Sequence, residues 1–379
     1  MATKLDALIT EFNKQHKEQI AARGIRRVCT QKIPFSSPRA CYMTYGGLPR
    51  GRIIEFAGEE NSGKTTTALD IVANAQMLFQ QEWENEITEL KSLDKLTKEK
   101  QNRLTVLETT GPQQVVYADC ENTLDEDWAS LLGVDVNNMI VLKPMSQTAE
   151  QIFEMLLQTI DTGEVGLVVI DSLGVMLSAQ AYEKTMEDKT YGGIASALTL
   201  FSKKAELLCA KYNCTLIGIN QMRDNLNSAY GGLTTTGGKA WKHNASLRLM
   251  FQKGSFIDEK GNELKRSAEE PAGNLVMMSI AKTKVCKPDR RTGFYTLNYT
   301  DGIDVVTDTV ETALKFGIIQ QAGAWFTFVD TNSGELVLDE QGEPLKVQGK
   351  QNVIQYLKAT PDFLQTLKSQ LSALMEGEQ

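Results

Sequence analysis

The fold of this chain is decided by the stretch Gly58-Glu59-Glu60-Asn61-Ser62-Gly63-Lys64-Thr65, which lies between a short apolar segment and a segment of helical pattern. It fits the P-loop pattern Gly-x-x-x-x-Gly-Lys-Thr at each fixed position, and a strand before it and a helix after it are the context that this pattern requires. In such a loop, consecutive backbone N–H groups and the positive end of the helix point at bound phosphates. The sequence therefore predicts a nucleotide site.

The residue types of this loop indicate ATP and Mg²⁺ as cofactors. Lys64 is expected to reach the β and γ phosphates, and the Thr65 hydroxyl is expected to bind the metal. Asp171 ends an apolar segment that begins at Leu167. An acid at the end of a strand is the second metal-binding residue of many P-loop proteins, so Asp171 is the second predicted metal residue. The residues expected around the nucleotide are Gly58, Glu59, Glu60, Asn61, Ser62, Gly63, Lys64, Thr65 and Thr66.

Hydrolysis of ATP also requires a group that orients the attacking water, and two acids are candidates. Asp119 ends the apolar segment that begins at Gln114, and Glu121 follows two residues later. Both are expected at the sheet edge that carries the P-loop. We predict that Glu121 has this role, although sequence order alone leaves Asp119 nearly tied with it.

Short apolar segments alternate with helical patterns through the core of the chain. Strands that are apolar without alternation are buried on both faces, as in a parallel sheet covered by helices. We therefore predict a doubly wound α/β core with a twisted, mainly parallel sheet. The alternating segments are Arg52–Ala57, Thr65–Phe79, Gln114–Asp119, Ala149–Thr162, Leu167–Asp171, Ala195–Tyr212 and Thr215–Asn220.

The N-terminal region, residues 1–32, is predicted to be an amphipathic helix that ends near Gly24, followed by a linker. Leu5, Leu8 and Phe12 recur at helical spacing, and the proline-containing stretch 33–38 continues the linker pattern. An apolar stripe on a helix must be buried. The pattern leaves open whether the stripe docks on a neighbouring subunit, which would make it an oligomerisation helix, or on the chain's own core.

The core is expected to span residues 33–303, with a charge-rich helical insertion at residues 80–112. The insertion is typical of a solvated surface structure. Residues 304–379 contain helical patterns around a probable hairpin, Trp325 to Val347, and are expected to form a small α+β domain.

Composition excludes several classes of protein. Hydrophobic residues make up 41% and charged residues 23% of the 379 residues, and no apolar run approaches the roughly 18 residues of a membrane span. The first residues lack a secretory signal, so a cytoplasmic protein without a membrane partner is expected. The six cysteines and two histidines have no zinc-site spacing. Because the net charge is −8, any DNA site must be a local basic groove.

The motifs together resemble the RecA recombinases, and they follow one another in the same order over almost the whole chain. The resemblance implies a RecA-type P-loop NTPase core with an N-terminal oligomerisation helix and a small C-terminal domain. The motifs are Gly46-Gly-Leu-Pro-Arg-Gly51-Arg-Ile-Ile-Glu, Asp119-Cys-Glu121-Asn-Thr-Leu-Asp125, Leu132-Gly-Val-Asp135, Ile219-Asn-Gln221-Met-Arg223, Thr234-Thr-Thr-Gly-Gly238, Ala245-Ser-Leu-Arg248-Leu and Ala322-Gly-Ala-Trp325.

The resemblance assigns roles around the nucleotide. It implies that Glu121 activates the water and that Gln221 senses the γ-phosphate. It places Asp125 and Trp128 at the adenine, with Trp128 standing where the family usually has a tyrosine. Finally, it implies that Lys282 and Lys284 reach the γ-phosphate of a neighbouring subunit, as an arginine finger supplied in trans would do. Without the resemblance, two lysines on an alternating strand are more simply a solvated face.

Two segments lack the apolar periodicity of the core, Gln180–Gly193 and Met222–Gly238. Composition alone leaves open whether they are DNA-binding loops or surface loops without function. The resemblance favours DNA. It implies that the primary strand is held by Thr199, Lys203, Arg223, Gly237 and Gly238, with Tyr191 and Tyr230 wedged between groups of bases.

Several positions depart from the family. Ser196 replaces an arginine of the primary DNA site, and His243 replaces an aromatic residue. The basic secondary DNA site of the family corresponds here to Gln252, Lys253, Met277 and Ser279, of which only one is charged. Each lost cation removes about one phosphate contact, so capture of a second DNA is expected to be weaker, unless the insertion or the stretch 260–266 compensates.

The leading hypothesis is an ATP-dependent protein of homologous recombination that forms filaments on single-stranded DNA. It would pair that strand with a homologous duplex and exchange strands, with DNA-stimulated ATP hydrolysis. One rival is a ring-forming helicase or packaging motor, which would supply an arginine in trans in place of Lys282 and Lys284. The other rival is a filament-forming binding protein that has lost strand exchange.

Overall fold

The computed structural model describes residues 4–16, 31–183, 193–224, 233–259, 261–265, 267–339 and 341–377. The chain divides into two units, residues 1–31 and 32–379. In the first unit, the predicted helix is present as α1, Lys4–His16. In the second, the stretch expected to be a linker is part of the folded core, because Ile33 and Phe35 are buried and Ser37 caps helix α2, Pro38–Thr44. The prediction of a linker at residues 33–38 was therefore wrong.

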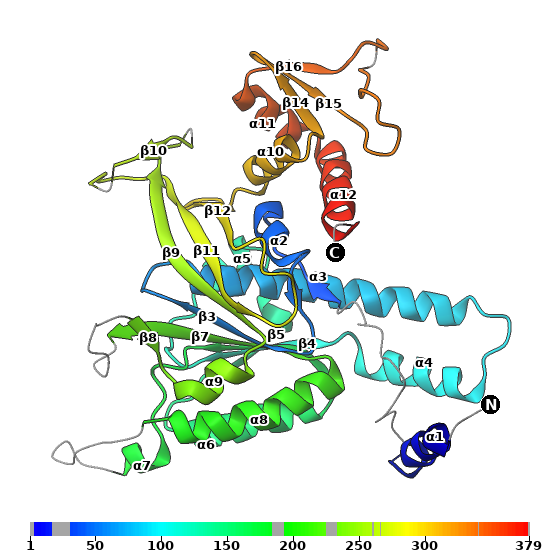
Figure 1. The fold of residues 1–379 in the computed structure, drawn as a ribbon, viewed down its shortest axis with the longest axis vertical. Coiled ribbons are helices and arrows are strands. Elements are labelled where there is room, and N and C mark those ends of the chain that lie inside the picture. Colours follow the sequence, from blue (N-terminus) through cyan, green and yellow to red (C-terminus); the bar gives the residue numbers. More distant parts are fainter. Residues whose placement is uncertain are drawn as a thin grey trace. The chain divides into compact units, whose positions relative to one another are not determined.

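The second unit is built on one large mixed sheet (Figure 1). Its central strands run parallel, as predicted, and the order β9-β3-β7-β6-β4-β5 places the P-loop strand β3 next to β7. An antiparallel wing, β11-β12-β13, extends the sheet beyond β9. The bounds are β3 Ile53–Gly58, β4 Gln114–Asp119, β5 Met139–Leu142, β6 Val165–Asp171, β7 Thr215–Asp224, β9 Leu247–Ile257, β11 Gly273–Thr283, β12 Thr292–Asn298 and β13 Gly302–Ile303.

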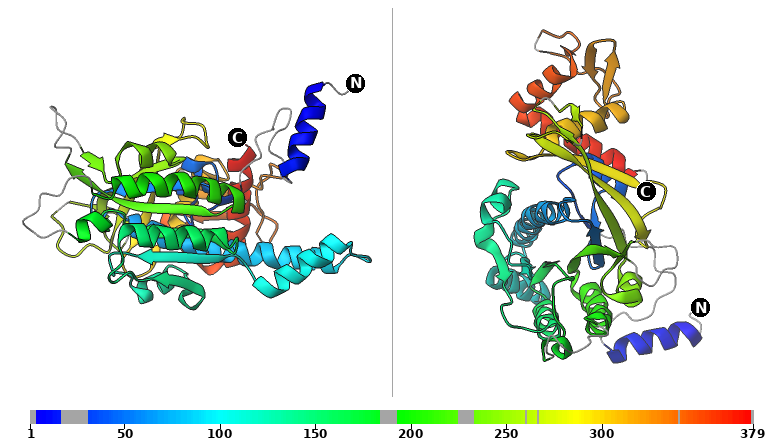
Figure 2. Two further views of the ribbon diagram at one scale, coloured as in Figure 1. Left: turned by 90° about the horizontal axis from the view of Figure 1, so that it is seen from below. Right: turned by 90° about the vertical axis from the view of Figure 1, so that its left-hand side faces the viewer.

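Helices cover both faces of the parallel strands, which explains why these strands are apolar without alternation (Figure 2). In β6, Val168 and Ile170 belong to the core beneath α6 and α8, whereas Leu167 and Val169 belong to the core on the α3 side. The helices are α3 Lys64–Lys91, α5 Glu126–Leu131, α6 Ala149–Asp161, α7 Ala179–Tyr182, α8 Ala195–Tyr212 and α9 Gly238–Asn244. A 3-10 turn, Val136–Asn138, precedes β5, and a short β1–β2 pair joins Lys32–Ile33 to Leu48–Pro49.

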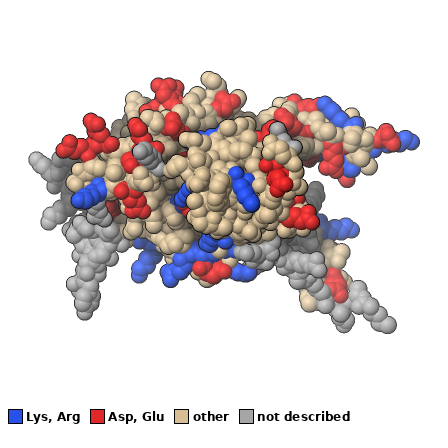
Figure 3. Space-filling view, turned by 90° about the horizontal axis from the view of Figure 1, so that it is seen from above, with Lys and Arg blue, Asp and Glu red and all other residues tan. Residues whose placement is uncertain are grey.

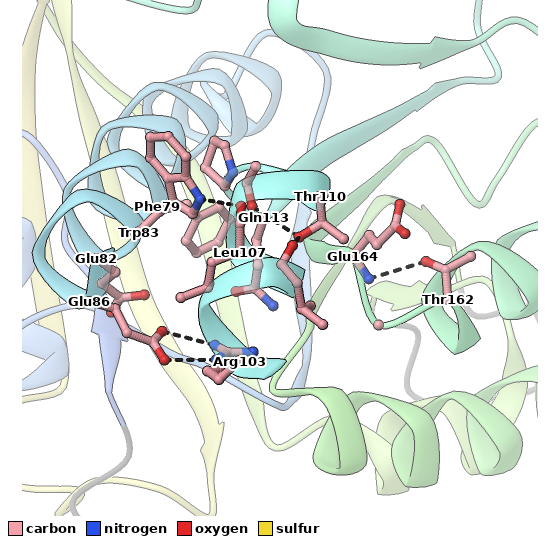
Figure 4. Close-up of a pocket in the computed structure, with 14 residues that line it drawn as sticks. Phe79, Glu82, Trp83, Glu86, Arg103, Leu107, Thr110, Gln113, Thr162 and Glu164 are labelled. Carbon is pink, nitrogen blue, oxygen red and sulfur yellow. Dashed lines mark hydrogen bonds and ion pairs between the residues drawn. The ribbon is translucent and has the colours of Figure 1, made fainter. Parts of the chain in front are cut away.

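The predicted insertion is a helical hairpin formed by the far end of α3 and by α4, Lys98–Thr110. The hairpin has a small core of its own, and Arg50 anchors its base. The Arg50 guanidinium is 3% exposed, donates to both Glu82 oxygens at 3.0 and 2.7 Å, and lies over the Phe79 ring. A cavity of about 280 Å³ lies where this base meets the turn at residues 162–164, with Trp83 in its wall (Figure 4).

The hairpin extends away from the P-loop. Helix α3 has 28 residues, and a helix rises 1.5 Å per residue, so its two ends are about 40 Å apart. The cavity at the hairpin base includes Gln113 and Glu164, which precede β4 and β6, so the base lies at the amino ends of these strands. Lysine, arginine and acidic side chains are interspersed along the arm that α3 and α4 form (Figure 3), and the ion pairs Arg103–Glu86 and Lys91–Glu108 tie its helices together.

The C-terminal region folds as an α+β domain, as predicted. Its three-stranded antiparallel sheet packs with three helices, and the expected hairpin is the pairing of Phe326 with Val347. The elements are α10 Val305–Lys315, β14 Ile319–Ala322, β15 Trp325–Phe328, β16 Lys346–Gln348, α11 Lys350–Ala359 and α12 Pro361–Gly377. Helix α10 meets α2 through an ion pair of Arg39 with the buried carboxylate Asp308, whose pKa burial raises to about 7.

Among the described residues, no helix is long and apolar enough to cross a membrane.

Candidate nucleotide and DNA site

The P-loop connects the carboxyl end of β3 to the amino end of α3. Gly63 has a φ of 92°, which L side chains rarely adopt, and a Cβ on Gly58 would lie 2.5 Å from the Phe251 carbonyl oxygen. Glycine is therefore required at both positions by backbone geometry. The Lys64 ammonium donates to the carbonyls of Gly58 at 3.1 Å and Glu59 at 2.5 Å. Burial lowers the Lys64 pKa, and the charges of nearby acids oppose that shift.

Thr65 and Asp171 are in contact, as the predicted metal site requires. The Thr65 hydroxyl donates to Asp171 Oδ2 at 2.8 Å, and the Tyr117 hydroxyl donates to the same oxygen at 2.7 Å. Burial raises the Asp171 pKa, and these two hydrogen bonds oppose that shift. A hydroxyl beside a carboxylate is a donor set of hard oxygens that suits Mg²⁺, so the residues present fit the predicted metal. The peptide bond between Asp171 and Ser172 is cis.

Glu121 lies just beyond the end of β4, beside the end of β6 and residue Gln221 of β7. It accepts a hydrogen bond from the Ser172 hydroxyl at 2.5 Å and another from Gln221 Nε2 at 3.2 Å, both on Oε1. Asp119, its competitor in the sequence, accepts from the backbone N–H groups of Thr123 and Leu124 at 3.0 and 3.1 Å. Asp119 is therefore occupied in holding the turn, whereas Glu121 is joined to the residue predicted to sense the γ-phosphate.

The residues predicted to meet the adenine lie on α5. Asp125 is the N-cap of this helix, where its Oδ1 accepts from the Trp128 N–H at 2.9 Å. The Trp128 side chain is partly buried against the main core. These contacts give Asp125 a structural role in starting the helix, and contact with adenine stays a prediction for both residues.

Lys282 binds the end of a helix. Its ammonium donates to the carbonyls of Lys242 at 2.8 Å and His243 at 2.6 Å, in the last turn of α9. A cation there complements the negative end of the helix. Burial lowers the Lys282 pKa, with further contributions from the positive charges of Lys284 and Arg248. The Lys284 side chain is exposed, while its backbone N–H donates to Ser246.

The two predicted DNA segments lie only in part within the described residues. Tyr191 and Tyr230 fall outside them, as does the side chain of Arg223. The second segment is shorter than predicted, because β7 continues to Asp224 and its end pairs with β8, Leu233–Thr235. Gly237, the N-cap of α9, has a φ of 98°, and a Cβ there would lie 2.4 Å from Leu198.

The remaining predicted DNA residues lie around this helix start. Gly238 follows at a φ of 69°. On α8, Thr199 and the exposed Lys203 are four residues apart, so they share one face of the helix. The Thr199 hydroxyl donates to the Ala195 carbonyl of its own helix at 2.7 Å.

A buried polar network that sequence reasoning missed ties the end of this DNA segment, at Thr236, to Asn220, which lies just before its start. Asn220 donates to Glu55 Oε1 at 3.0 Å and to the Thr236 carbonyl at 2.8 Å, and accepts from the Thr236 N–H at 3.3 Å. Arg248 completes the network with an ion pair to Glu55. Asn220 immediately precedes Gln221, so the γ-phosphate sensor and the DNA segment are held by adjacent residues of one strand.

The four positions that correspond to the family's secondary DNA site lie on β9 and β11. Gln252 and Met277 are opposite each other on β9 and β11, and Ser279 is opposite Met250. The one charged residue of the set, Lys253, is exposed and lies 4.5 Å from the Phe256 ring centroid. Neutral side chains therefore occupy three of the four positions.

Relatives of this chain are called Protein RecA. The protein from Ruminococcus albus is 30% identical over 329 residues, which are 86% of this chain and 68% of the relative. That of Paracoccus denitrificans is 29% identical over 329 residues, 86% and 76% of the two chains. That of Chlorobaculum tepidum is 30% identical over 333 residues, 88% and 80% of the two chains.

Family models agree with these relatives. The model of the RecA N-terminal domain matches residues 12–82 and 102–304, and the model of the RecA C-terminal domain matches residues 307–376. The break between residues 82 and 102 falls within the α3–α4 hairpin, so the distal part of the hairpin lies outside the family match. Two models in chain order, over most of the sequence and around a complete P-loop, establish that the chain belongs to the RecA family of recombinases, as a divergent member with a helical insertion.

Proposed function

We propose that this protein assembles on single-stranded DNA with ATP and Mg²⁺, pairs that strand with a homologous duplex, exchanges strands, and hydrolyses ATP in response to DNA. The observation that carries the proposal is the hydrogen bond of Gln221 to Glu121. It joins the candidate water-activating carboxylate to β7, the strand that leads into the second DNA segment. If that segment moves on binding DNA, the movement can change the position of Gln221 and, through its hydrogen bond, that of Glu121.

Each residue of the site has a task in hydrolysis. With ATP bound, the Lys64 ammonium would exchange its loop carbonyls for the β and γ phosphates, and Thr65 and Asp171 would hold Mg²⁺. Mg²⁺, when bound, neutralises charge that develops on the phosphates. Glu121 takes a proton from the attacking water, and its Oε1 bonds from Ser172 and Gln221 fix the orientation of the carboxylate for that transfer.

The DNA-facing part of the mechanism depends on α9. Lys282 holds the last turn of α9, and Gly237, a predicted DNA residue, is the N-cap of the same helix. We infer that Lys282 and Lys284 leave these intramolecular surroundings or extend from them to a neighbour's γ-phosphate in the filament. Such a site is complete only between subunits, so isolated subunits are expected to hydrolyse ATP slowly.

A filament protein without strand exchange is the second candidate, favoured by the neutral side chains of Gln252, Met277 and Ser279. Placement argues against compensation by the insertion in the same subunit, because α3 carries it to the amino ends of the strands, whereas the DNA segments follow the carboxyl ends of β6 and β7. A helicase or packaging motor is disfavoured by the lysine pair, of which Lys282 lies on β11 and Lys284 directly follows that strand.

Strand exchange measured beside ATP hydrolysis separates the two candidates. The purified full chain is given ATP, Mg²⁺, single-stranded DNA and either a homologous or a heterologous duplex. We expect DNA-stimulated ATP hydrolysis and transfer of a strand from the homologous duplex only. ATP hydrolysis and filaments without any transfer would support the second candidate, and DNA-independent hydrolysis would contradict the proposal.

The N-terminal helix is proposed to dock on a neighbouring subunit. Deleting residues 1–24 is then expected to give a folded chain that no longer forms long filaments with ATP and DNA, because the stripe Leu5, Leu8 and Phe12 is lost. Circular dichroism reports folding and electron microscopy reports filament length. Replacing Asp6 and Glu11 by Ala on the other face is the control and should leave filaments long. Unfolding of the truncated chain would show that the helix packs on its own core.

A further inference from the structure

Tyr117 lies in the middle of the core and reaches the nucleotide site with its hydroxyl alone. Its side chain is 1% exposed, and its ring belongs to the apolar cluster on the α3 side of the sheet. In the β4–β6 register, Tyr117 is opposite Val169, and Asp119 is opposite Asp171. Residues two apart on a strand share a face, so the tyrosine ring extends diagonally to the end of β6, where its hydroxyl meets Asp171.

Two hydroxyl groups donate hydrogen bonds to one oxygen of Asp171. The hydroxyls of Tyr117 and Thr65 both donate to Asp171 Oδ2, at 2.7 and 2.8 Å. They come from different elements, β4 and α3, which both precede β6 in the chain. Within the described part of the chain, no hydrogen bond is recorded to Oδ1 of Asp171. A carboxylate held through one oxygen by two fixed hydroxyls cannot rotate freely, and its second oxygen stays available as an acceptor.

We propose that Tyr117 is a positioning residue for the metal: its hydroxyl sets the orientation of Asp171 so that Oδ1 is presented to Mg²⁺ or to a Mg²⁺-bound water. This inference rests on the proposed ATP and Mg²⁺ site. Phenylalanine would fill the same space in this apolar cluster without a buried hydroxyl to satisfy, so the hydroxyl has no packing purpose. Partners that orient a metal-binding carboxylate affect metal affinity more than they affect the fold.

The chain supplies a matched control for the test. Tyr295, on β12, is also 1% exposed, and its hydroxyl lies 2.8 Å from the Thr67 hydroxyl. Thr67 belongs to α3, as Thr65 does, two residues further along. Tyr117→Phe and Tyr295→Phe therefore each remove one buried hydroxyl that forms a hydrogen bond close to the start of α3. Only Tyr117→Phe removes a hydrogen bond to Asp171.

The measurement is the Mg²⁺ dependence of binding of a fluorescent ATP analogue to the full chain. Tyr117→Phe is expected to raise the Mg²⁺ concentration at half-maximal binding about 10-fold or more, as loss of such orienting partners does at other metal sites. Binding in EDTA should be unchanged. At saturating Mg²⁺, DNA-stimulated turnover should return to within about twofold of the unsubstituted protein, because the carboxylate itself is intact. Tyr295→Phe should leave the Mg²⁺ midpoint unchanged.

An unchanged midpoint in Tyr117→Phe, or the same shift in both variants, would overturn the positioning role while leaving the proposed function standing. Failure of the unsubstituted protein to bind the analogue with any dependence on Mg²⁺ would instead remove the proposed function, and this inference with it. Thermal unfolding of both variants checks that each is folded. A Tyr117→Phe chain that is less stable yet keeps the wild-type midpoint counts against the proposal.

Discussion

Replacing Glu121 by Gln is expected to lower DNA-stimulated ATP turnover by a factor on the order of 10² or more, while ATP affinity stays unchanged. The substituted side chain keeps its length and retains an oxygen that can accept from Ser172 and Gln221, so the local hydrogen bonds survive. It cannot take a proton from water. The loss therefore falls on the chemical step, and single-turnover hydrolysis measured beside equilibrium ATP binding separates the two quantities.

Asp119→Asn is the matched control for this prediction. Asp119 accepts from two backbone N–H groups of the turn that follows β4, and an amide can accept through one oxygen only. This variant is expected to lose stability, seen as a lower unfolding temperature, with turnover per folded molecule changed far less than in Glu121→Gln. If Asp119→Asn abolished turnover and Glu121→Gln remained active, the catalytic carboxylate would have been assigned to the wrong residue.

Mixing two inactive variants is expected to restore ATP turnover. Lys64→Ala removes the cation that contacts the β and γ phosphates in its own subunit, and changing both Lys282 and Lys284 to Ala removes the cations offered to the neighbour. Each variant alone should lack DNA-stimulated turnover. In a mixed filament, a subunit with an intact P-loop can stand next to a Lys64→Ala subunit that still has its lysine pair. With random head-to-tail assembly of equal amounts, about a quarter of the sites are complete.

The mixing experiment needs two controls. Lys282 also holds the last turn of α9, so the double variant could lose activity through a loosened helix, and thermal unfolding checks this. Lys284→Ala alone is the milder variant, because that side chain is exposed. Co-assembly is verified by labelling the two chains with different dyes. Absence of turnover in filaments that contain both chains would end the assignment in trans and leave Lys282 as a helix cap.

The sequence alone predicts the backbone geometry of the P-loop, because that geometry is encoded locally. The P-loop requires glycine at positions where the backbone has positive φ or leaves no space for a Cβ, and the helix follows directly, so a short motif carries the whole geometry. The runs of apolar residues in β3, β4, β6 and β7 predicted a sheet buried on both faces, because each strand carries this signal within its own residues. The prediction of a linker at residues 33–38 failed because prolines occur both in linkers and in the first turn of a helix, and Pro38 is in the first turn of α2.

Only the tertiary structure gives different surroundings to residues that are equivalent in sequence. Asp119 and Glu121 are nearly tied in the sequence, but the strand order puts β6 between β4 and β7, which brings Ser172 and Gln221 to Glu121. These contacts support the proposal that Glu121 is the catalytic carboxylate. The contacts of Tyr117 with Asp171 and of Asn220 with Glu55 join residues 54 and 165 positions apart. No local pattern records such pairs, because hydrogen bonds at the carboxyl ends of parallel strands depend on which strands become neighbours and in which register, and the burial of the whole sheet sets both.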